Sequence, residues 1–196
     1  QNGMGNAEAI AEIVAAEQVF IGLCFVCAMM DEPGIINHLE GGTIQFAPMQ
    51  PTDSGVAQAE ELAALFAGTP VETRTARHAE QILWTKLSWN IPFNGLCLAL
   101  GGISIRQLFC MPEQVERARA IMNEVCRTAE MRGYPLPLEI VREQMERTSK
   151  MGDPVEYEAI WGTTLARARE VQAPVPEWTR LCADIRARLD ECSSHS

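Results

Sequence analysis

The spacing of apolar positions divides the chain into two parts that meet near residue 75. In the first part, a nearly continuous apolar stretch over residues 18–29 is typical of a strand that is buried on both faces. Turn residues and shorter apolar runs predict the other elements of this part, which are a short helix at 7–16, a strand at 42–47, a helix at 55–66 and a β segment at 71–75. Strand, helix and strand in this order predict the end of an open α/β sheet.

In the second part, the apolar spacing predicts helices only. The first of them, over residues 76–100, is apolar on almost every side, and the next, over 112–132, is amphipathic with a proline in its first turn. Three further helices are predicted at 137–150, 155–172 and 177–192. We therefore predict an α/β domain over residues 1–75, followed by an all-helical domain over residues 76–196.

The charge of the chain restricts the classes of partner that it could bind. Its 196 residues include 16 basic and 26 acidic side chains, which give a formal net charge of −10. This balance argues against nucleic acid or an anionic membrane surface as a partner. The longest apolar run, over residues 19–30, is well short of the ~20 residues that a helix needs to cross a bilayer, so we expect no membrane span.

The seven cysteines are odd in number, and most lie inside apolar patterns. This predicts free, buried thiols in a reducing cytoplasm. Cys24 and Cys27 have C-x-x-C spacing, but both lie in the predicted buried strand. No second cysteine pair or nearby histidine completes a metal site there, so we expect structural thiols and no metal.

The long apolar helix contains three polar residues at intervals of four, namely Lys86, Asn90 and Asn94. Because four residues turn a helix by ~400°, these side chains lie along one side of it. A single residue of this kind is explained by a lysine that reaches solvent or an asparagine that bonds to backbone. Three in register favour a helix that lines a cleft. Pro92 removes a backbone donor beside them and predicts a bend.

Two further segments carry candidate chemistry. The glycine-rich turn that begins at Asn2 precedes the first helix, at a place where open α/β sheets bind ligands, although G-x-G alone is weak evidence for a phosphate site. Glu156 and Glu158 lie near a predicted helix start, where acidic residues favour the helix dipole. The alternative is a carboxylate that points back at Lys86 and shares a small cavity with it.

Taken together, these motifs resemble the ketopantoate reductase (2-dehydropantoate 2-reductase) family. The resemblance rests on the N-G-M-G segment, the W-x-K-L-x-x-N-x-x-x-N helix, the E-x-E-x-I-x-G segment and Val175-Pro176, in that order. It implies the C-terminal part of an NADP-binding Rossmann-type sheet, followed by an all-helical domain of the 6-phosphogluconate dehydrogenase C-terminal type. It also implies a chain that lacks most of its dinucleotide-binding domain, with NADPH as the cofactor.

The resemblance implies a role for each candidate on the helix. Lys86 would be the catalytic acid, which polarises the keto oxygen of 2-dehydropantoate and donates a proton as pantoate forms for pantothenate and coenzyme A synthesis. Asn90 and Asn94 would bind the hydroxyl and carboxylate groups of the substrate. A preplaced cation in a dry cleft is well suited to stabilise an alkoxide as it develops.

The resemblance also implies residues at the cofactor. Asn2 would reach both the cofactor ribose and the substrate, Ala28 would lie beside the nicotinamide at the end of its strand, and Glu156 would bond near the substrate hydroxyl and the cofactor. The family carries a substrate-binding serine about a dozen residues before this glutamate, whereas Ser149 precedes Glu156 by only seven residues. We therefore do not assign that role to Ser149, and we predict a chain break between Lys150 and Val155.

Two alternatives stay open at this stage. The first is a reductase of a different, branched or aromatic 2-keto acid, whose pocket Trp89, Phe93 and Trp161 would shape. The second is a non-catalytic module, in which the apolar helix forms a dimer interface and Lys86 is incidental. A homodimer through the helical domain is compatible with either. The surroundings of Lys86, a cavity or a flat subunit contact, distinguish the two.

Overall fold

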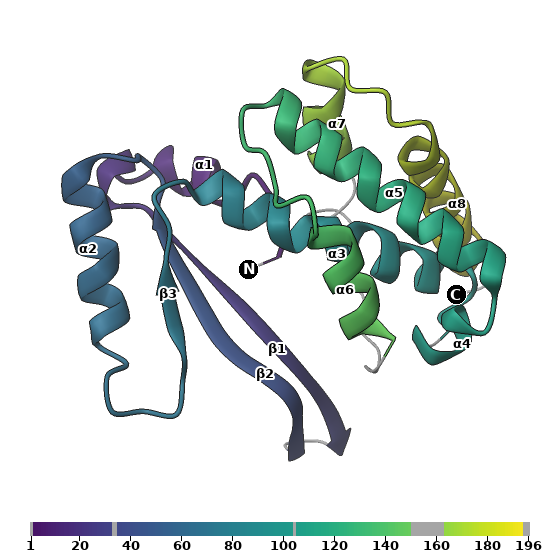
Figure 1. Cartoon of the computed structure of the whole chain (residues 1–196), viewed down its shortest axis with the longest axis horizontal. Coiled ribbons are helices and arrows are strands. Elements are labelled where there is room, and N and C mark those ends of the chain that lie inside the picture. Colours follow the sequence, from purple (N-terminus) through teal and green to yellow (C-terminus); the bar gives the residue numbers. More distant parts are fainter. Residues whose placement is uncertain (1, 33–34, 104, 150–162, 194–196) are drawn as a thin grey trace. The chain divides into compact units, whose positions relative to one another are not determined.

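A computed structural model describes residues 2–32, 35–103, 105–149 and 163–193 (Figure 1). By their contacts, the residues form two units. The first is essentially Gly5–Ile82, and the second combines Asn2–Met4 with Leu83–Ser196. The division falls inside a helix rather than near residue 75. The assignment of the two parts as a cofactor domain and a substrate domain stays a prediction.

The first unit is built on a three-stranded sheet with the order β1-β2-β3. β1 and β2 are antiparallel, whereas β2 and β3 are parallel, and α2 connects and packs against the parallel pair. The elements of this unit are α1 (Asn6–Ala11), η1 (Ala16–Gln18), β1 (Phe20–Glu32), β2 (Ile35–Pro48), α2 (Asp53–Ala64) and β3 (Thr73–Thr75). Strand, helix and parallel strand in this order confirm the α/β prediction.

The turn that leads into α2 is set by local chemistry. The Thr52 hydroxyl accepts a hydrogen bond from the Gly55 backbone N–H at 3.0 Å, which caps the helix. A Cβ at Gly55 would lie 2.9 Å from the carbonyl oxygen of Gln50 and from the Cβ of Pro48. The close approach of the two backbones therefore requires glycine there. The rings of Phe46 and Phe66, with centroids 5.9 Å apart, join this helix to the sheet.

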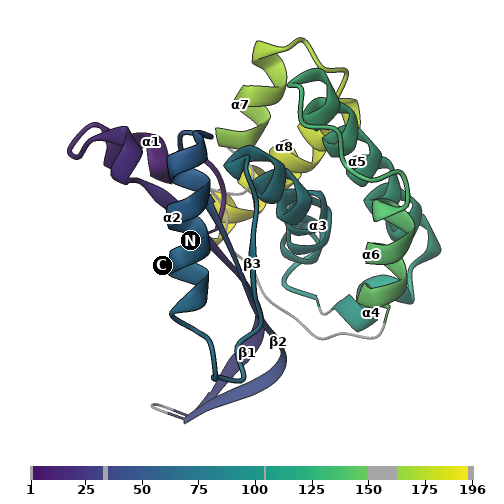
Figure 2. The ribbon, with the colours of Figure 1, turned by 60° about the vertical axis from the view of Figure 1, so that its left-hand side comes forward.

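The prediction that the first strand is buried on both faces is wrong. β1 and β2 form one long hairpin (Figures 1 and 2), and β3 pairs only with residues 44–46 of β2. Leu23 is 1% exposed, but Val26 is 56% exposed and Cys24 is exposed as well. An apolar run records the composition of a strand, whereas burial of each face also needs an element packed against that face.

A bulge divides this hairpin. The pairing shifts register between Phe25 and Val26, and Gly41, the partner of Val26, has a φ of 87°. A Cβ at Gly41 would lie 2.3 Å from the carbonyl oxygen of Phe25, so only glycine fits. The strand predicted at residues 42–47 begins at Ile35 in the structure, because backbone pairing with β1 continues beyond the bulge.

The regular structure that is described in the second unit is helical. They are α3 (Ala79–Ala99), α4 (Ile105–Phe109), α5 (Pro112–Met131), α6 (Ile140–Thr148), α7 (Thr163–Glu170) and α8 (Pro176–Ser193). α5 contacts α4, α6 and α8. The prediction of a helical second part is confirmed for the described residues, and residues 155–162 of the helix predicted at 155–172 lie outside them. Within the described residues the sequence analysis missed α4, because five residues are too few for a helical period to be recognised. No helix in the described ranges is long and apolar enough to cross a membrane.

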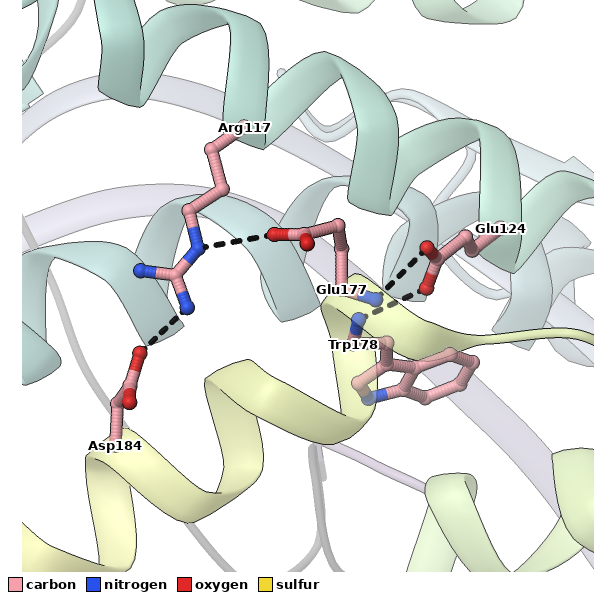
Figure 3. A network of polar contacts seen from close by, with 5 residues as sticks. All are labelled: Arg117, Glu124, Glu177, Trp178 and Asp184. Carbon is pink, nitrogen blue, oxygen red and sulfur yellow. Dashed lines mark hydrogen bonds and ion pairs between the residues drawn. The ribbon is translucent and has the colours of Figure 1, made fainter.

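A buried carboxylate fixes the start of α8 (Figure 3). Glu124 on α5, which is 8% exposed, accepts hydrogen bonds from the backbone N–H groups of Glu177 at 2.9 Å and Trp178 at 2.8 Å. These are donors of the first turn of α8 that no helical carbonyl can satisfy. Burial raises the pKa of Glu124, and the two N–H donors oppose that rise. Arg117 forms ion pairs with Glu177 and Asp184 beside it.

Candidate active site

The three candidate residues of the long helix lie on one side of α3. α3 is continuous from Ala79 to Ala99, so residues 86, 90 and 94 follow one another along its surface. Asn90 is 4% exposed and Asn94 is 5% exposed, and Lys86 is half-buried. The prediction that Pro92 bends the helix stays a prediction, since α3 continues through that residue.

Asn94 carries the most informative atom of the helix. Its Oδ1 is buried, and no group in the described part of the chain donates a hydrogen bond to it. A buried acceptor without a donor costs about 1–3 kcal/mol, and few such atoms occur in native proteins. A ligand that brings a hydroxyl or an N–H group to this atom would remove the penalty. The side of α3 that carries Asn94 is therefore a candidate ligand-binding surface.

The polar groups on the α6 side of α3 are arranged differently. Gln144 of α6 donates from Nε2 to the carbonyl oxygen of Thr85 at 3.0 Å, and its Oε1 accepts from the Ser88 hydroxyl at 3.0 Å. The Trp89 indole N–H donates to the Thr148 hydroxyl at 2.6 Å. Residues 85, 88 and 89 point roughly 150° away from residues 86, 90 and 94, at 100° per residue. α3 thus carries two polar faces with different partners.

The sequence did not reveal Gln144 or Thr148. Both lie on the short amphipathic helix α6, more than fifty residues from the groups that they contact. Gln144 is 6% exposed and Thr148 is fully buried, although polar side chains on such a helix are ordinarily expected in solvent. Only the packing of α6 against α3 identifies them.

The N-terminal segment belongs with the helices. Asn2–Met4 group with the helical unit, and Met4 is 4% exposed. Gly3 and Gly5 have φ values of 81° and 96°, in the left-handed region that favours glycine. α1 begins directly afterwards at Asn6, as the glycine-rich turn predicts. Asn2 and Lys86 are therefore in the same unit of the chain.

The remaining cofactor candidates are placed as follows. Ala28 lies inside β1, opposite His38 of β2, and is exposed in the sheet unit. The prediction that Ala28 ends its strand is wrong, because pairing with β2 carries β1 on to Glu32. Glu156 and Trp161 lie outside the described residues, as does the predicted chain break between Lys150 and Val155. Their roles stay predictions.

None of the five cysteines whose side chains the structure describes forms a disulfide bond, and not all of them are buried. Cys97 is buried, whereas Cys24 and Cys110 are exposed, so the prediction of buried thiols is wrong for these two. Burial raises the pKa of the Cys126 thiol to about 11, which keeps it protonated and unreactive near neutral pH. Among the described residues, no three His, Cys, Asp or Glu side chains gather where they could hold a metal ion.

Two sequence models of one protein family match the chain. The model described as ketopantoate reductase PanE/ApbA C terminal matches residues 78–189, and the model described as ketopantoate reductase PanE/ApbA matches residues 1–51. The chain belongs to this family. The first match covers the helix with Lys86, Asn90 and Asn94, and the second covers Asn2 and the long hairpin.

Individual relatives agree with this membership. The 2-dehydropantoate 2-reductase of Nostoc sp. (strain PCC 7120) is 29% identical over 195 residues, which cover 90% of this chain and 60% of that protein. The crystal structure of 2-dehydropantoate 2-reductase from Geobacter metallireducens GS-15 is 32% identical, with a TM-score of 0.86, and the match covers 95% of this chain and 66% of that one. The chain thus spans about 60% of the length of the curated relative.

A structure of D-mandelate dehydrogenase, solved with NADH and anilino(oxo)acetate, has the same fold. It is 20% identical with a TM-score of 0.81, and the match covers 97% of this chain and 65% of that one. At this identity the likeness concerns the fold alone. The fold is therefore shared by proteins whose names refer to different compounds, the 2-keto acid 2-dehydropantoate and the 2-hydroxy acid mandelate.

Proposed function

We propose that the full-length protein reduces a 2-keto acid with NADPH, and that its substrate is 2-dehydropantoate. One observation carries the proposal. In a chain of the ketopantoate reductase family, Asn94 Oδ1, a buried acceptor to which none of the described residues donates, lies on the same side of α3 as Lys86 and Asn90. This arrangement favours a small polar substrate at that side of the helix.

Each polar residue of this face then has a distinct role. The Lys86 ammonium group donates a hydrogen bond to the keto oxygen and transfers a proton to it as the alkoxide develops. A site next to the apolar helix α3 would exclude water when substrate is bound, which would strengthen this interaction. Asn94 Oδ1 can only accept, so its partner must be a donor such as the substrate hydroxyl. Asn90 holds the remaining polar end of the substrate.

The described residues do not fit the diphosphate of a dinucleotide. Both helices of the sheet unit have an acidic residue in the first turn, Glu8 in α1 and Asp53 in α2, and the Thr52 hydroxyl already occupies the start of α2. Acidic groups at these positions disfavour phosphate. The sequence also contains no G-x-G-x-x-G. We propose NADPH as the hydride donor from the family resemblance, with Asn2, Ala28 and Glu156 near its nicotinamide end.

The net charge of −10 favours a small-molecule substrate over nucleic acid or an anionic membrane surface. A cytoplasmic location follows from the proposed place of the reaction in pantothenate and coenzyme A synthesis. A homodimer through the helical unit stays a prediction.

Two observations argue against the alternatives. The rings of Trp89 and Phe93 lie 5.5 Å apart, Phe93 stacks on Phe109 at 6.0 Å, and Phe93 is fully buried. This ring cluster belongs to the core, which speaks against a pocket for an aromatic keto acid at these residues. Leu87 and Ile91 of α3 are at most 1% exposed in the folded chain, so their apolar surface is already covered and offers no flat contact to a second subunit.

A substrate panel tests the proposal. The full-length protein is assayed with NADPH and 2-dehydropantoate, with branched 2-keto acids and with aromatic 2-keto acids, and consumption of NADPH is followed. We expect kcat/KM for 2-dehydropantoate to exceed the others by at least about tenfold, or ~1.4 kcal/mol. A preference for another keto acid would replace the proposed substrate, and no reduction of any of them would contradict the reaction.

A further inference from the structure

The rotation of α3 about its own axis is weakly determined by hydrophobic contacts. Buried apolar side chains point in nearly every direction from this helix: Ile82, Leu83, Trp84, Leu87, Ile91, Phe93 and Leu96 are all at most 9% exposed. A helix that is apolar all round can bury similar area in several rotational positions. Directional polar contacts are then what select one of them, as single buried polar residues do in other helical assemblies.

Gln144 of α6 supplies such contacts at the turn that carries Lys86. Its Nε2 donates to the carbonyl oxygen of Thr85, and its Oε1 accepts from the Ser88 hydroxyl, both at 3.0 Å. Thr148 lies one turn further along α6, and its hydroxyl donates to the backbone carbonyl oxygen of Gln144 at 2.6 Å. The same hydroxyl accepts from Trp89 at 2.6 Å. Two turns of α6 therefore contact one segment of α3.

The contact to Thr85 bears directly on the lysine. The carbonyl of Thr85 and the backbone N–H of Lys86 belong to the same planar peptide group. A hydrogen bond to that carbonyl therefore holds the plane from which the Lys86 side chain departs. The same turn lacks one helical hydrogen bond, because Pro92 has no N–H to offer the carbonyl of Ser88. Side-chain contacts from α6 thus support α3 where its own backbone bonding is incomplete.

Small rotations of this helix matter for the chemistry. Side chains lie about 5–6 Å from a helix axis, so a rotation of about 10° moves them by about 1 Å. A displacement of about 1 Å at a reacting group is enough to cost about 10²-fold in rate. The contacts that set the rotation of α3 lie on the face away from the candidate site.

We propose that Gln144 is a positioning residue for Lys86: its two hydrogen bonds to the turn from Thr85 to Ser88 set the rotation of α3 and thereby aim the lysine at the substrate. The inference rests on the proposed function, since it takes Lys86 as the proton donor. It adds a residue of α6 that touches neither substrate nor cofactor and acts only through α3.

The test is Gln144→Met in the full-length protein, assayed for kcat, KM and the pH profile of kcat. Methionine keeps the length of the side chain but makes neither hydrogen bond. The Ser88 hydroxyl retains an acceptor, because its one proton is shared between Gln144 Oε1 and the Thr85 carbonyl oxygen, which lies 2.8 Å away. We therefore expect a Tm close to that of the wild type. We expect kcat to fall about tenfold or more, KM to change by less than about threefold, and the limb of the pH profile that reports the lysine to shift.

The matched control is Thr128→Val on α5. Thr128 is also fully buried, and its hydroxyl donates to the Glu124 carbonyl oxygen at 2.9 Å. A purely structural role for Gln144 predicts that the two variants change Tm and kcat alike. Positioning of Lys86 predicts a lower kcat and a shifted pH profile for Gln144→Met only.

Lys86→Met, assayed in parallel, separates this inference from the proposed function. If Lys86→Met leaves kcat unchanged, the lysine is not the proton donor and both proposals fail. If Lys86→Met abolishes turnover while folded Gln144→Met keeps kcat within about twofold, only the positioning role is overturned. Should Gln144→Met not fold, Ser88→Ala removes a single hydroxyl at the same contact. We then expect about a threefold fall in kcat, and an unchanged kcat would overturn the inference.

Discussion

The two polar faces of α3 differ in where their partners come from. On the side of α6, the Thr85 carbonyl and the Ser88 hydroxyl bond to Gln144, which is itself buried. On the other side, Asn94 Oδ1 is equally buried and has no donor within the described residues. Both faces contain neutral polar groups on one helix. What separates them is whether the protein itself satisfies the group, and an unsatisfied group points to a ligand.

The sheet unit also has a buried acceptor, Gln45 Oε1 on β2, that finds no donor within the described residues. Among its described helices, α2 is capped by its own Thr52 hydroxyl, and both α1 and α2 begin with an acidic residue in the first turn. The candidates Lys86, Asn90 and Asn94 lie on α3, and Asn2 groups with the helical unit. Variants on the two faces of α3 should accordingly affect different quantities.

The largest effect is expected at Lys86. Lys86→Met should lower kcat by about 10²-fold or more, which corresponds to ~2.7 kcal/mol of transition-state stabilisation, because the proton donor is lost. Steady-state kinetics on the full-length protein measures it. Arg119→Met, which removes an exposed cation from α5, is the control and should leave kcat unchanged. A loss of less than threefold for Lys86→Met would rule out the proposed role.

A smaller effect, on KM, is expected at the side of α3 that carries Asn90 and Asn94. Asn94→Leu should raise KM for the keto acid about fivefold, or ~1 kcal/mol, because one hydrogen bond to the substrate is lost. Its Tm should stay the same or rise, since the variant removes a buried acceptor that has no donor. Asn90→Ala should likewise raise KM. A lower Tm with an unchanged KM would mean that these asparagines serve the core instead.

The smallest effect is expected at Glu124, a buried carboxylate that accepts hydrogen bonds from backbone N–H groups of α8. Burial raises the pKa of Glu124 above 4.5, so ionisation costs more in the folded state than in the unfolded state. The stability that the protonated form of Glu124 contributes is fully present below its pKa in the unfolded chain. It is lost as pH rises through its pKa in the folded protein. Compared with Glu124→Gln, the wild type should therefore lose Tm as pH increases above about 4.5.

Thermal unfolding of both proteins across that pH range tests the expectation. Glu124→Gln also loses an acceptor for one of the two N–H groups at the start of α8, which lowers its stability at every pH. Because this loss is the same at every pH, only the way in which the Tm difference between the two proteins changes with pH reports the titration of Glu124. If the Tm of the wild type instead rises relative to that of Glu124→Gln as pH increases, the two N–H donors lower the pKa of Glu124 by more than burial raises it.

Periodicity accounts for what the sequence predicted well. The limits of α3, α5 and α8 lie within about three residues of the predicted ones, because a helical pattern of some twenty residues depends on local spacing alone. The alignment of Lys86, Asn90 and Asn94 on one side of α3 follows from the same spacing. The parallel pairing of β2 and β3 also follows, since a helix between two adjacent strands leads to that topology.

The features that the sequence analysis predicted wrongly or missed depend mostly on pairing and packing between distant segments. The exposure of Val26 and the extension of β1 past Ala28 depend on β2, and the burial of Gln144 depends on α3. None of these partners can be read from the residues on either side. α4 was missed for a different reason, because five residues do not establish a period.

The sequence by itself determined which residues could do chemistry and on which helix they lie, because a helix places every fourth side chain on one face whatever surrounds it. The tertiary structure alone decided which polar groups already have partners. α6 brings Gln144 to Ser88, while the described chain brings no donor to Asn94 Oδ1. The physical reason is that a hydrogen bond needs two groups within about 3 Å, and only folding brings distant segments that close.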